Sequence, residues 1–344
     1  MTMTAGAFRT SAAAAARREQ ADSHATARAA NVSGQDSPSY RRYVKPLPWI
    51  SVKDLLWALY LYPGRWLTQV SIPVMYGILR LCEPVFQVLC LRRQEGILGR
   101  LASAFGPNTP RSALRPILRA YIANAVRRAG DDLALERDNA RVHCRSFQGS
   151  EHLDAAVAAG RGVLLVSVHW YAGRAANRYL AACGYPVMTV RNGEPPDTHM
   201  GRLGGKFLQP RYVSFLHGVV RDEVFIQDRE CSLKILSRLR SGGIVGIQTD
   251  ASFSRHLIEL PFLGRMRRIP AGVLHMAHRS GCAVLPMCAF GHARALDIRI
   301  GPPVPLDRSL ASRAFCETHL PVVARILETC VREHPDQWEL WTRL

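Results

Sequence analysis

Two polar residues, His169 and Asp250, each follow an apolar stretch that predicts a buried strand. His169 comes directly after residues 163–168, and Asp250 follows residues 244–247 after two intervening positions. A histidine at a strand end can act as a general base, because its ordinary pKa lies near neutrality. The alternatives are a purely structural histidine and an aspartate that forms a turn or caps a helix. We predict catalytic roles for both residues.

The elements that would position these two residues alternate between strands and helices. This alternation predicts an α/β fold with a largely parallel central sheet flanked by helices. In such sheets, sites gather beyond the carboxyl ends of the strands, where both residues would lie. The predicted strands are 163–168, 187–190, 244–247, 282–288 and 296–300, and the predicted helices are 152–159, 172–183, 232–239, 271–279 and one near 323–331.

The N-terminal third divides by composition. Residues 1–45 are rich in alanine and arginine, which predicts a disordered tail. Residues 46–95 carry many aromatic side chains and apolar runs flanked by arginines, which favours a helical segment associated with a membrane surface. A helical hairpin buried on the protein core is the alternative. Residues 96–344 would then form the α/β domain.

The charge balance indicates an anionic partner. The chain of 344 residues has 45 basic and 27 acidic residues, a formal net charge of +18. A membrane surface or an acidic substrate fits this excess, and the absence of a recognised nucleic-acid module argues against nucleic acid. The nine cysteines show no zinc-ligand spacing, so we expect no metal and no organic cofactor.

Five sequence segments occur in an order that resembles the lysophospholipid acyltransferase superfamily, in its bacterial lipid A late-acyltransferase branch. The first segment resembles the strand that delivers that family's catalytic histidine, and the second resembles a strand ending in an aspartate. The last resembles the family's C-terminal signature. The segments are GVLLVSVHWYAG (162–173), GGIVGIQTD (242–250), LPFLG (260–264), PAGVLHMAHRSGCAVLPM (270–287) and HPDQWELWTRL (334–344).

The resemblance implies an acyltransferase at the cytoplasmic face of the inner membrane. The donor would be acyl-carrier protein or acyl-CoA, and the acceptor a lipid hydroxyl, as on a lipid A precursor or a lysolipid. The histidine would take the proton of that hydroxyl. In the family, a carboxylate five positions after the histidine orients the ring.

The sequence departs from the family at that carboxylate, because Arg174 stands five positions after His169. Arginine has no hydrogen-bond acceptor and cannot receive the ring N–H. Three interpretations stay open. Another acceptor replaces the carboxylate, with Asp250, Glu194, Asp197 or a backbone carbonyl as candidates. Alternatively, Arg174 binds a phosphate or carboxylate of an unusual acceptor, or the protein binds lipid or acyl carrier without turnover.

Further residues are candidates for binding the substrate. Arg191 and Arg211 resemble basic positions of the family near the acceptor, and Arg174 joins them under the second interpretation above. Pro261, Phe262 and Gly264 lie in the LPFLG segment and are expected to shape a loop on the acceptor side. Solvated arginines and an ordinary turn are the alternatives.

Overall fold

A computed structural model describes most of the α/β region and part of the helical region before it. The described residues are 54–55, 58, 62, 66, 69–135, 142–191, 203–208, 210–211, 214–215, 222–251 and 256–342. All of them belong to one compact unit, Trp49–Leu344. The predicted tail, residues 1–45, lies outside the described residues.

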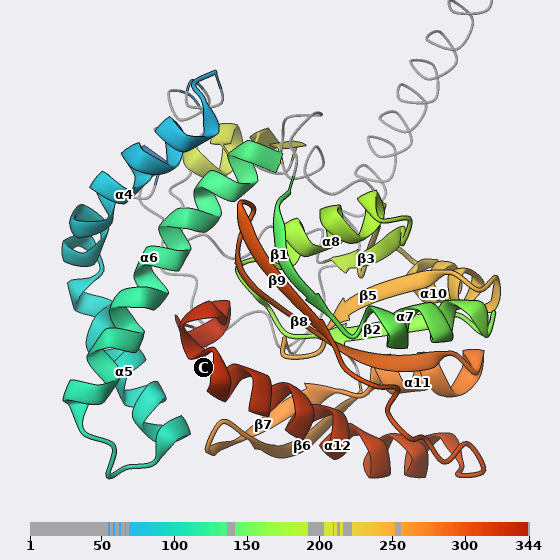
Figure 1. The fold of residues 1–344 in the computed structure, drawn as a ribbon. Helices are drawn as coiled ribbons and strands as arrows, with labels where there is room; N and C mark the ends of the chain where they lie inside the picture. Colours follow the sequence, from blue (N-terminus) through green and yellow to red (C-terminus); the bar gives the residue numbers. More distant parts are fainter. Residues whose placement is uncertain are drawn as a thin grey trace, which may run out of the picture. The chain divides into compact units, whose positions relative to one another are not determined.

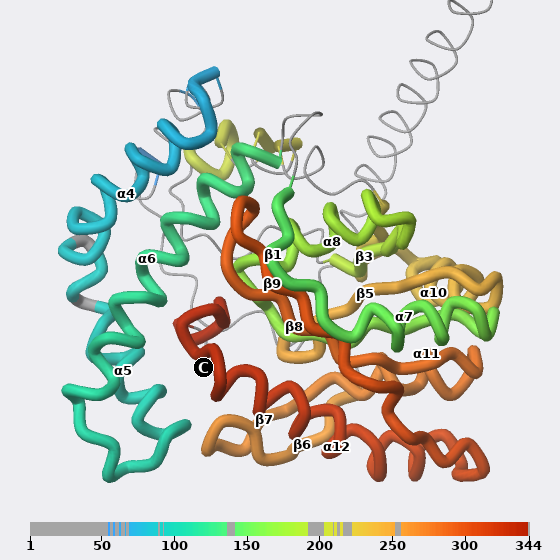
Figure 2. The backbone as a smooth tube through the Cα atoms, viewed as in Figure 1, coloured from blue at the N-terminus to red at the C-terminus, as the bar shows by residue number. Residues whose placement is uncertain are grey.

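Three helices precede the sheet: α4 (Ile72–Leu89), α5 (Leu91–Phe105) and α6 (Arg111–Leu135). Figures 1 and 2 show α4 running alongside α6. The two helices approach closely at Gly130, where an added Cβ would lie 2.4 Å from a methyl carbon of Leu79. The prediction of helices in this region is confirmed. No single described helix is long and apolar enough to span a membrane. The bent pair formed by Ile72–Val88 and Arg93–Phe105 has the length and composition of a membrane-crossing segment only when its two helices are taken together.

Seven strands of the described chain form one sheet, in the order β1-β9-β8-β2-β5-β3-β4 (Figure 1). All neighbours are parallel except β8 and β9, so the predicted largely parallel sheet is confirmed. All five residues of β2 are buried, because the strand lies at the centre and both its faces are covered. The bounds are β1 (Cys144–Gln148), β2 (Val163–Ser167), β3 (Val187–Arg191), β4 (Glu223–Phe225), β5 (Ile244–Gln248), β8 (Ala283–His292) and β9 (Ala295–Ile300).

Helices cover both faces of the sheet. The connection from β2 to β3 and the connection from β4 to β5 cross the sheet in opposite directions. Right-handed crossovers therefore place their helices, α8 and α10, on opposite faces. Helices α11 and α12 follow α10 in the same layer. The hydroxyl of Tyr185, in the segment after α8, donates to Asp154 in α7. The bounds are α7 (Ser150–Ala158), α8 (Gly173–Ala182), α10 (Cys231–Arg240), α11 (Gly272–Ser280) and α12 (Ser312–Glu333).

Strands β1 and β4, the β6–β7 hairpin and the fold of the C-terminal segment were not predicted from the sequence. The first three residues of the LPFLG segment, Leu260 to Phe262, belong to β6 (Leu257–Phe262), whose antiparallel partner is β7 (Arg265–Pro270), and Leu263 and Gly264 form the turn between the two strands. The chain also ends in two short 3-10 helices, Pro335–Gln337 and Glu339–Thr342, which pack against α6 and α5. Trp338 and Trp341 in this segment are fully buried, so the C-terminal segment is part of the core.

Candidate active site

The register of the sheet brings His169 and Asp250 together. Strands β2 and β5 are parallel neighbours, and Ser167 at the end of β2 pairs with Gln248 at the end of β5. His169 and Asp250 each stand two positions beyond these paired residues. Both side chains therefore leave the sheet at the same carboxyl edge, where sites of α/β proteins form.

Asp250 binds the histidine through both carboxylate oxygens. Its Oδ1 lies 2.5 Å from Nδ1 of His169, and its Oδ2 accepts a 2.9 Å hydrogen bond from the backbone N–H of the same residue. The indole N–H of Trp338 donates to Oδ2 at 2.6 Å. With its side chain only 1% exposed, Asp250 is a buried carboxylate whose charge is stabilised by three hydrogen bonds.

The two groups shift each other's protonation. Burial alone would lower the pKa of His169, but the negative charge of Asp250 and their hydrogen bond outweigh burial and raise that pKa above 6.5. Burial alone would raise the pKa of Asp250, but the charge and hydrogen bonds of His169 lower it below 3.8. Such a pair favours an ionised aspartate, with the ring proton held on Nδ1. That arrangement leaves the lone pair of Nε2 able to accept a proton.

The imidazole is accessible. The side chain of His169 is 30% exposed, and within the described part of the chain no hydrogen bond to its Nε2 is found. The ring is therefore not sealed among packed side chains, and a hydroxyl group can reach it. Trp170 and Tyr171, which follow His169, are both buried.

The guanidinium of Arg174 binds the carboxylate of Asp132 in α6. Asp132 also lies 3.9 Å from Arg128, which binds Glu339 at 2.6 Å. The charge of Arg174 is therefore balanced from another helix. The prediction that Arg174 binds substrate is not tested by these contacts, which engage it with the protein itself.

The C-terminal segment makes hydrogen bonds to both residues of the site. Besides the bond from Trp338 to Asp250, the backbone N–H of Glu339 donates to the carbonyl of His169 at 2.8 Å. The hydroxyl of Tyr121 in α6 donates to the carbonyl of Glu339 at 2.9 Å. Sequence reasoning recognised this segment only as a signature. The first tryptophan of HPDQWELW, Trp338, is the sequence signal that corresponds to this partner of Asp250.

The two other arginines predicted to bind substrate lie elsewhere around the sheet. Arg191, at the end of β3, binds Glu223 of the neighbouring strand β4. Arg211 is exposed, and its guanidinium lies 4.9 Å from the ring centre of Tyr62. Their substrate contacts stay predictions. The candidates Glu194 and Asp197 lie outside the described residues.

The LPFLG residues form one end of the β6–β7 hairpin. Pro261 is exposed, whereas Phe262 is buried and meets Trp338 edge-on at 6.1 Å between ring centres. Leu263 and Gly264 form the turn, both with positive φ, as in the tight turns typical of two-residue hairpins. The expectation of a loop is wrong for Pro261 and Phe262, because cross-strand pairing makes them a strand. Phe262 supports the site through Trp338.

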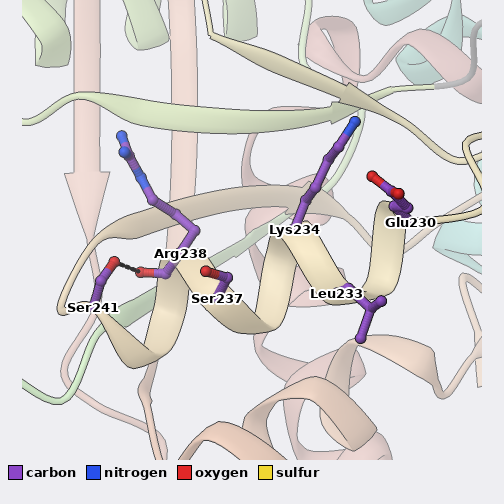
Figure 3. A pocket seen from close by; sticks show the side chains of 6 residues that line it. All are labelled: Glu230, Leu233, Lys234, Ser237, Arg238 and Ser241. Carbon is purple, nitrogen blue, oxygen red and sulfur yellow. Dashed lines mark hydrogen bonds between the residues drawn. The ribbon is translucent and has the colours of Figure 1, made fainter.

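Two surface hollows lie away from the histidine. A shallow hollow of about 470 Å³ is lined by residues of α10 and its two ends, and Lys234 and Arg238 project from the helix there (Figure 3). Both cations have acidic partners, Asp228 at 3.6 Å and Asp222 at 3.0 Å. A second hollow of about 240 Å³ lies between strands β1 and β9 and the end of α12. Neither is lined by His169 or Asp250, so neither is the candidate site.

Comparisons with known proteins identify the family of this chain. The sequence model of a family described as bacterial lipid A biosynthesis acyltransferase matches residues 133–344, which include His169, Asp250 and Trp338. Two curated relatives from strains of Mycobacterium tuberculosis, both named phosphatidylinositol mannoside acyltransferase, are 27% and 26% identical over 214 residues. The similarity covers 59% of this chain and 61% of each relative, so the chain spans about three fifths of their length. Because the family match extends over more than half of the sequence, the chain belongs to the bacterial lipid A biosynthesis acyltransferase family.

Proposed function

We propose that this protein transfers a fatty acyl group from a thioester donor to a hydroxyl group of a lipid, with His169 as the general base. The single observation that carries the proposal is the accessible imidazole held by a buried carboxylate at the sheet edge. An alcohol has a very high pKa and attacks a thioester efficiently only if a base takes its proton during attack.

The chemistry follows from the two side chains. Nε2 of His169 takes the hydroxyl proton while the hydroxyl oxygen bonds to the thioester carbonyl carbon. The tetrahedral intermediate collapses, the carbon–sulfur bond breaks, and the imidazolium returns the proton to the departing sulfur. Asp250 holds the ring in one tautomer and stabilises the imidazolium through the 2.5 Å contact. Asp250 thus supplies the acceptor that the position of Arg174 lacks.

The net charge and the family support a proposal for the donor and the acceptor. A formal net charge of +18 suits an acidic acyl-carrier protein, with acyl-CoA as the other thioester donor. The family description and the names of the relatives both refer to lipids that carry sugars. We therefore propose a sugar-bearing lipid as acceptor, such as a lipid A precursor, with lysolipids as the second choice.

A membrane surface is proposed as the place of reaction, at the cytoplasmic face of the inner membrane. The outer side of α4 exposes apolar side chains at spacings of three and four residues, which place them on one helix face. Arg80 in α4 and Arg93 at the start of α5 (Leu91–Phe105) are also exposed, and their charges suit contact with anionic lipid. The exposed apolar residues are Val74, Ile78, Leu81, Val85 and Val88, and Leu81 is 80% exposed.

The test of catalysis uses purified protein with labelled acyl-carrier protein or acyl-CoA and a panel of glycolipid and lysolipid acceptors. We expect wild-type turnover with at least one acceptor, and loss of turnover by a factor of about 10³ or more in His169→Ala. The exposed His143 provides the control variant His143→Ala, which should keep full activity. Donor binding without turnover across the whole panel would favour the alternative of a lipid- or acyl-binding protein.

Membrane association is tested separately by flotation with vesicles that contain phosphatidylglycerol. The double variant Leu81→Gln/Val85→Gln should bind such vesicles at least tenfold more weakly, because it removes apolar area from the exposed face of α4. Leu233→Gln is a matched control, since Leu233 is 67% exposed on α10. Equal binding of all three proteins would exclude α4 as the docking surface.

A further inference from the structure

A charged residue occupies the inner face of the β6–β7 hairpin. In the antiparallel register, Arg267 lies opposite Leu260, and both side chains point to the same face. Leu260, Phe262 and Ile269 on this face are buried. The adjacent Arg268 points to the opposite face and is exposed. Arg267 thus lies on the inner face of the hairpin, together with these apolar residues.

The inward guanidinium is incompletely satisfied. Its Nη1 is buried and has no hydrogen-bond partner among the residues that the structure describes. A buried polar atom without a hydrogen-bond partner is destabilising, so such atoms are uncommon in folded proteins. An anion supplied from outside the chain would remove this cost. The position therefore indicates a ligand.

Arg267 also lies within the electrostatic reach of the catalytic pair. Burial lowers the pKa of Arg267, and the negative charge of Asp250 opposes that effect. The same hairpin contacts the site through Phe262 and Trp338, whose indole N–H donates to Asp250. An anion bound at Arg267 would accordingly be part of a molecule that also reaches His169.

We propose that Arg267 binds a phosphate group of a substrate and so positions that substrate beside His169. The proposal rests on the proposed acyl transfer and deepens it, because it names the chemical group that the site recognises. A guanidinium presents a planar fork of donors that matches phosphate oxygens in two parallel hydrogen bonds. The phosphate can belong to the headgroup of the acceptor lipid or to the phosphopantetheine arm of the donor, and the experiment separates these two sources.

The experiment compares Arg267→Gln with wild type and with Arg268→Gln, a matched control on the outer face of the same strand. Steady-state kinetics are measured with a phosphorylated and a phosphate-free glycolipid acceptor, and with acyl-CoA and an acyl-N-acetylcysteamine thioester as donors. We expect KM for the phosphate-bearing partner to rise at least tenfold in Arg267→Gln, with kcat changed less than threefold. The affected partner identifies the source of the phosphate. Arg267→Lys should bind the phosphate-bearing partner more tightly than Arg267→Gln, because the ammonium group keeps the positive charge, but less tightly than wild type, because it lacks the two parallel donors of the guanidinium.

A second measurement does not depend on turnover. Inorganic phosphate should raise the melting temperature of wild type and of Arg268→Gln, but not that of Arg267→Gln. If Arg267→Gln responds to phosphate like wild type and shows unchanged KM for every substrate, the proposal is wrong. A shift of the kcat pH profile with unchanged KM would instead mean that Arg267 only balances the charge of Asp250. Phosphate protection of wild type in the absence of all turnover would refute the proposed acyl transfer while supporting the anion site.

Discussion

Asp250 contacts His169 at two atoms of the same residue, the ring Nδ1 at 2.5 Å and the backbone N–H at 2.9 Å. This double contact fixes both the ring and the chain that carries it. The carboxylate that contacts the imidazole therefore comes from the residue two positions after β5, and not from the helix that follows the histidine. The contact joins two residues that follow the neighbouring strands β2 and β5.

The first prediction concerns Asp250→Asn. An amide leaves no negative charge to stabilise the imidazolium and favours the wrong ring tautomer, so we expect kcat to fall by a factor of about 10⁴, by analogy with triads. The base works only when it is unprotonated, so wild-type activity should be lost as pH falls through the raised pKa of His169. In the variant the midpoint should move to lower pH, because burial then acts without the opposing carboxylate. Measuring kcat/KM from pH 5 to 9 checks both effects. An unchanged midpoint would show that Asp250 does not act on the ring.

The second prediction concerns the ion pair between Arg174 and Asp132. Asp132 is buried, so Arg174→Ala should destabilise the fold by about 3 kcal/mol by leaving that carboxylate poorly compensated. Arg174→Glu should be worse, because it places two carboxylates together; it should not restore the family's orienting carboxylate. The combination Arg174→Leu/Asp132→Leu should recover most of the lost stability. Denaturant unfolding of the single and double variants measures the coupling, and additive losses would show that the pair is not coupled.

The third prediction concerns Gly264 in the turn of the hairpin. Its φ is +74°, and a Cβ would lie 2.0 Å from the carbonyl oxygen of Ser103 in α5. Gly281 has a φ of +75° with nothing within 4 Å of an added Cβ. Gly281→Ala should therefore cost about 1 kcal/mol for the backbone alone. Gly264→Ala should cost about 3 kcal/mol, because overpacking adds to the backbone strain. Equal losses in thermal or denaturant unfolding would show that the hairpin does not approach α5 this closely.

The fourth prediction concerns Asp131, which accepts hydrogen bonds from the Tyr76 hydroxyl and from the backbone N–H of Ala293. Burial raises the pKa of Asp131 from 3.8 to about 7. In the unfolded chain the carboxyl of Asp131 is ionised above about pH 4, whereas in the folded protein it keeps its proton up to about pH 7. The free energy of unfolding should therefore fall as pH rises from about 4 to 7. Asp131→Asn keeps the accepting oxygen and should remove this slope, giving a more stable protein at pH 8.

The measurement for Asp131 is the free energy of unfolding between pH 4.5 and 8. The difference between Asp131→Asn and wild type should grow with pH by a few kcal/mol, since one pKa unit corresponds to about 1.4 kcal/mol. Glu151→Gln, at an exposed position of α7, serves as the charge control and should follow wild type. A difference that is constant across the range would mean that Asp131 is already ionised in the folded protein.

Local sequence determined much of this fold. Uninterrupted apolar runs predicted β2, β3, β5 and β8, because strands covered on both faces need apolar residues at every position. It also placed His169 and Asp250 at the ends of two such strands. Strands β1 and β4 and the β6–β7 hairpin escaped prediction, because edge strands and exposed hairpins carry polar residues in no simple pattern.

Only the tertiary structure decided which residues meet. That β2 pairs with β5 and not with β3, its nearest predicted strand along the chain, is a non-local choice, and this choice brings Asp250 to His169. The partnership of Arg174 with Asp132 and of Trp338 with Asp250 likewise joins segments far apart in the sequence. The type of a side chain determines which chemistry a residue can perform. The packing of distant elements determines which residues it contacts, because strand order and helix docking depend on the whole core.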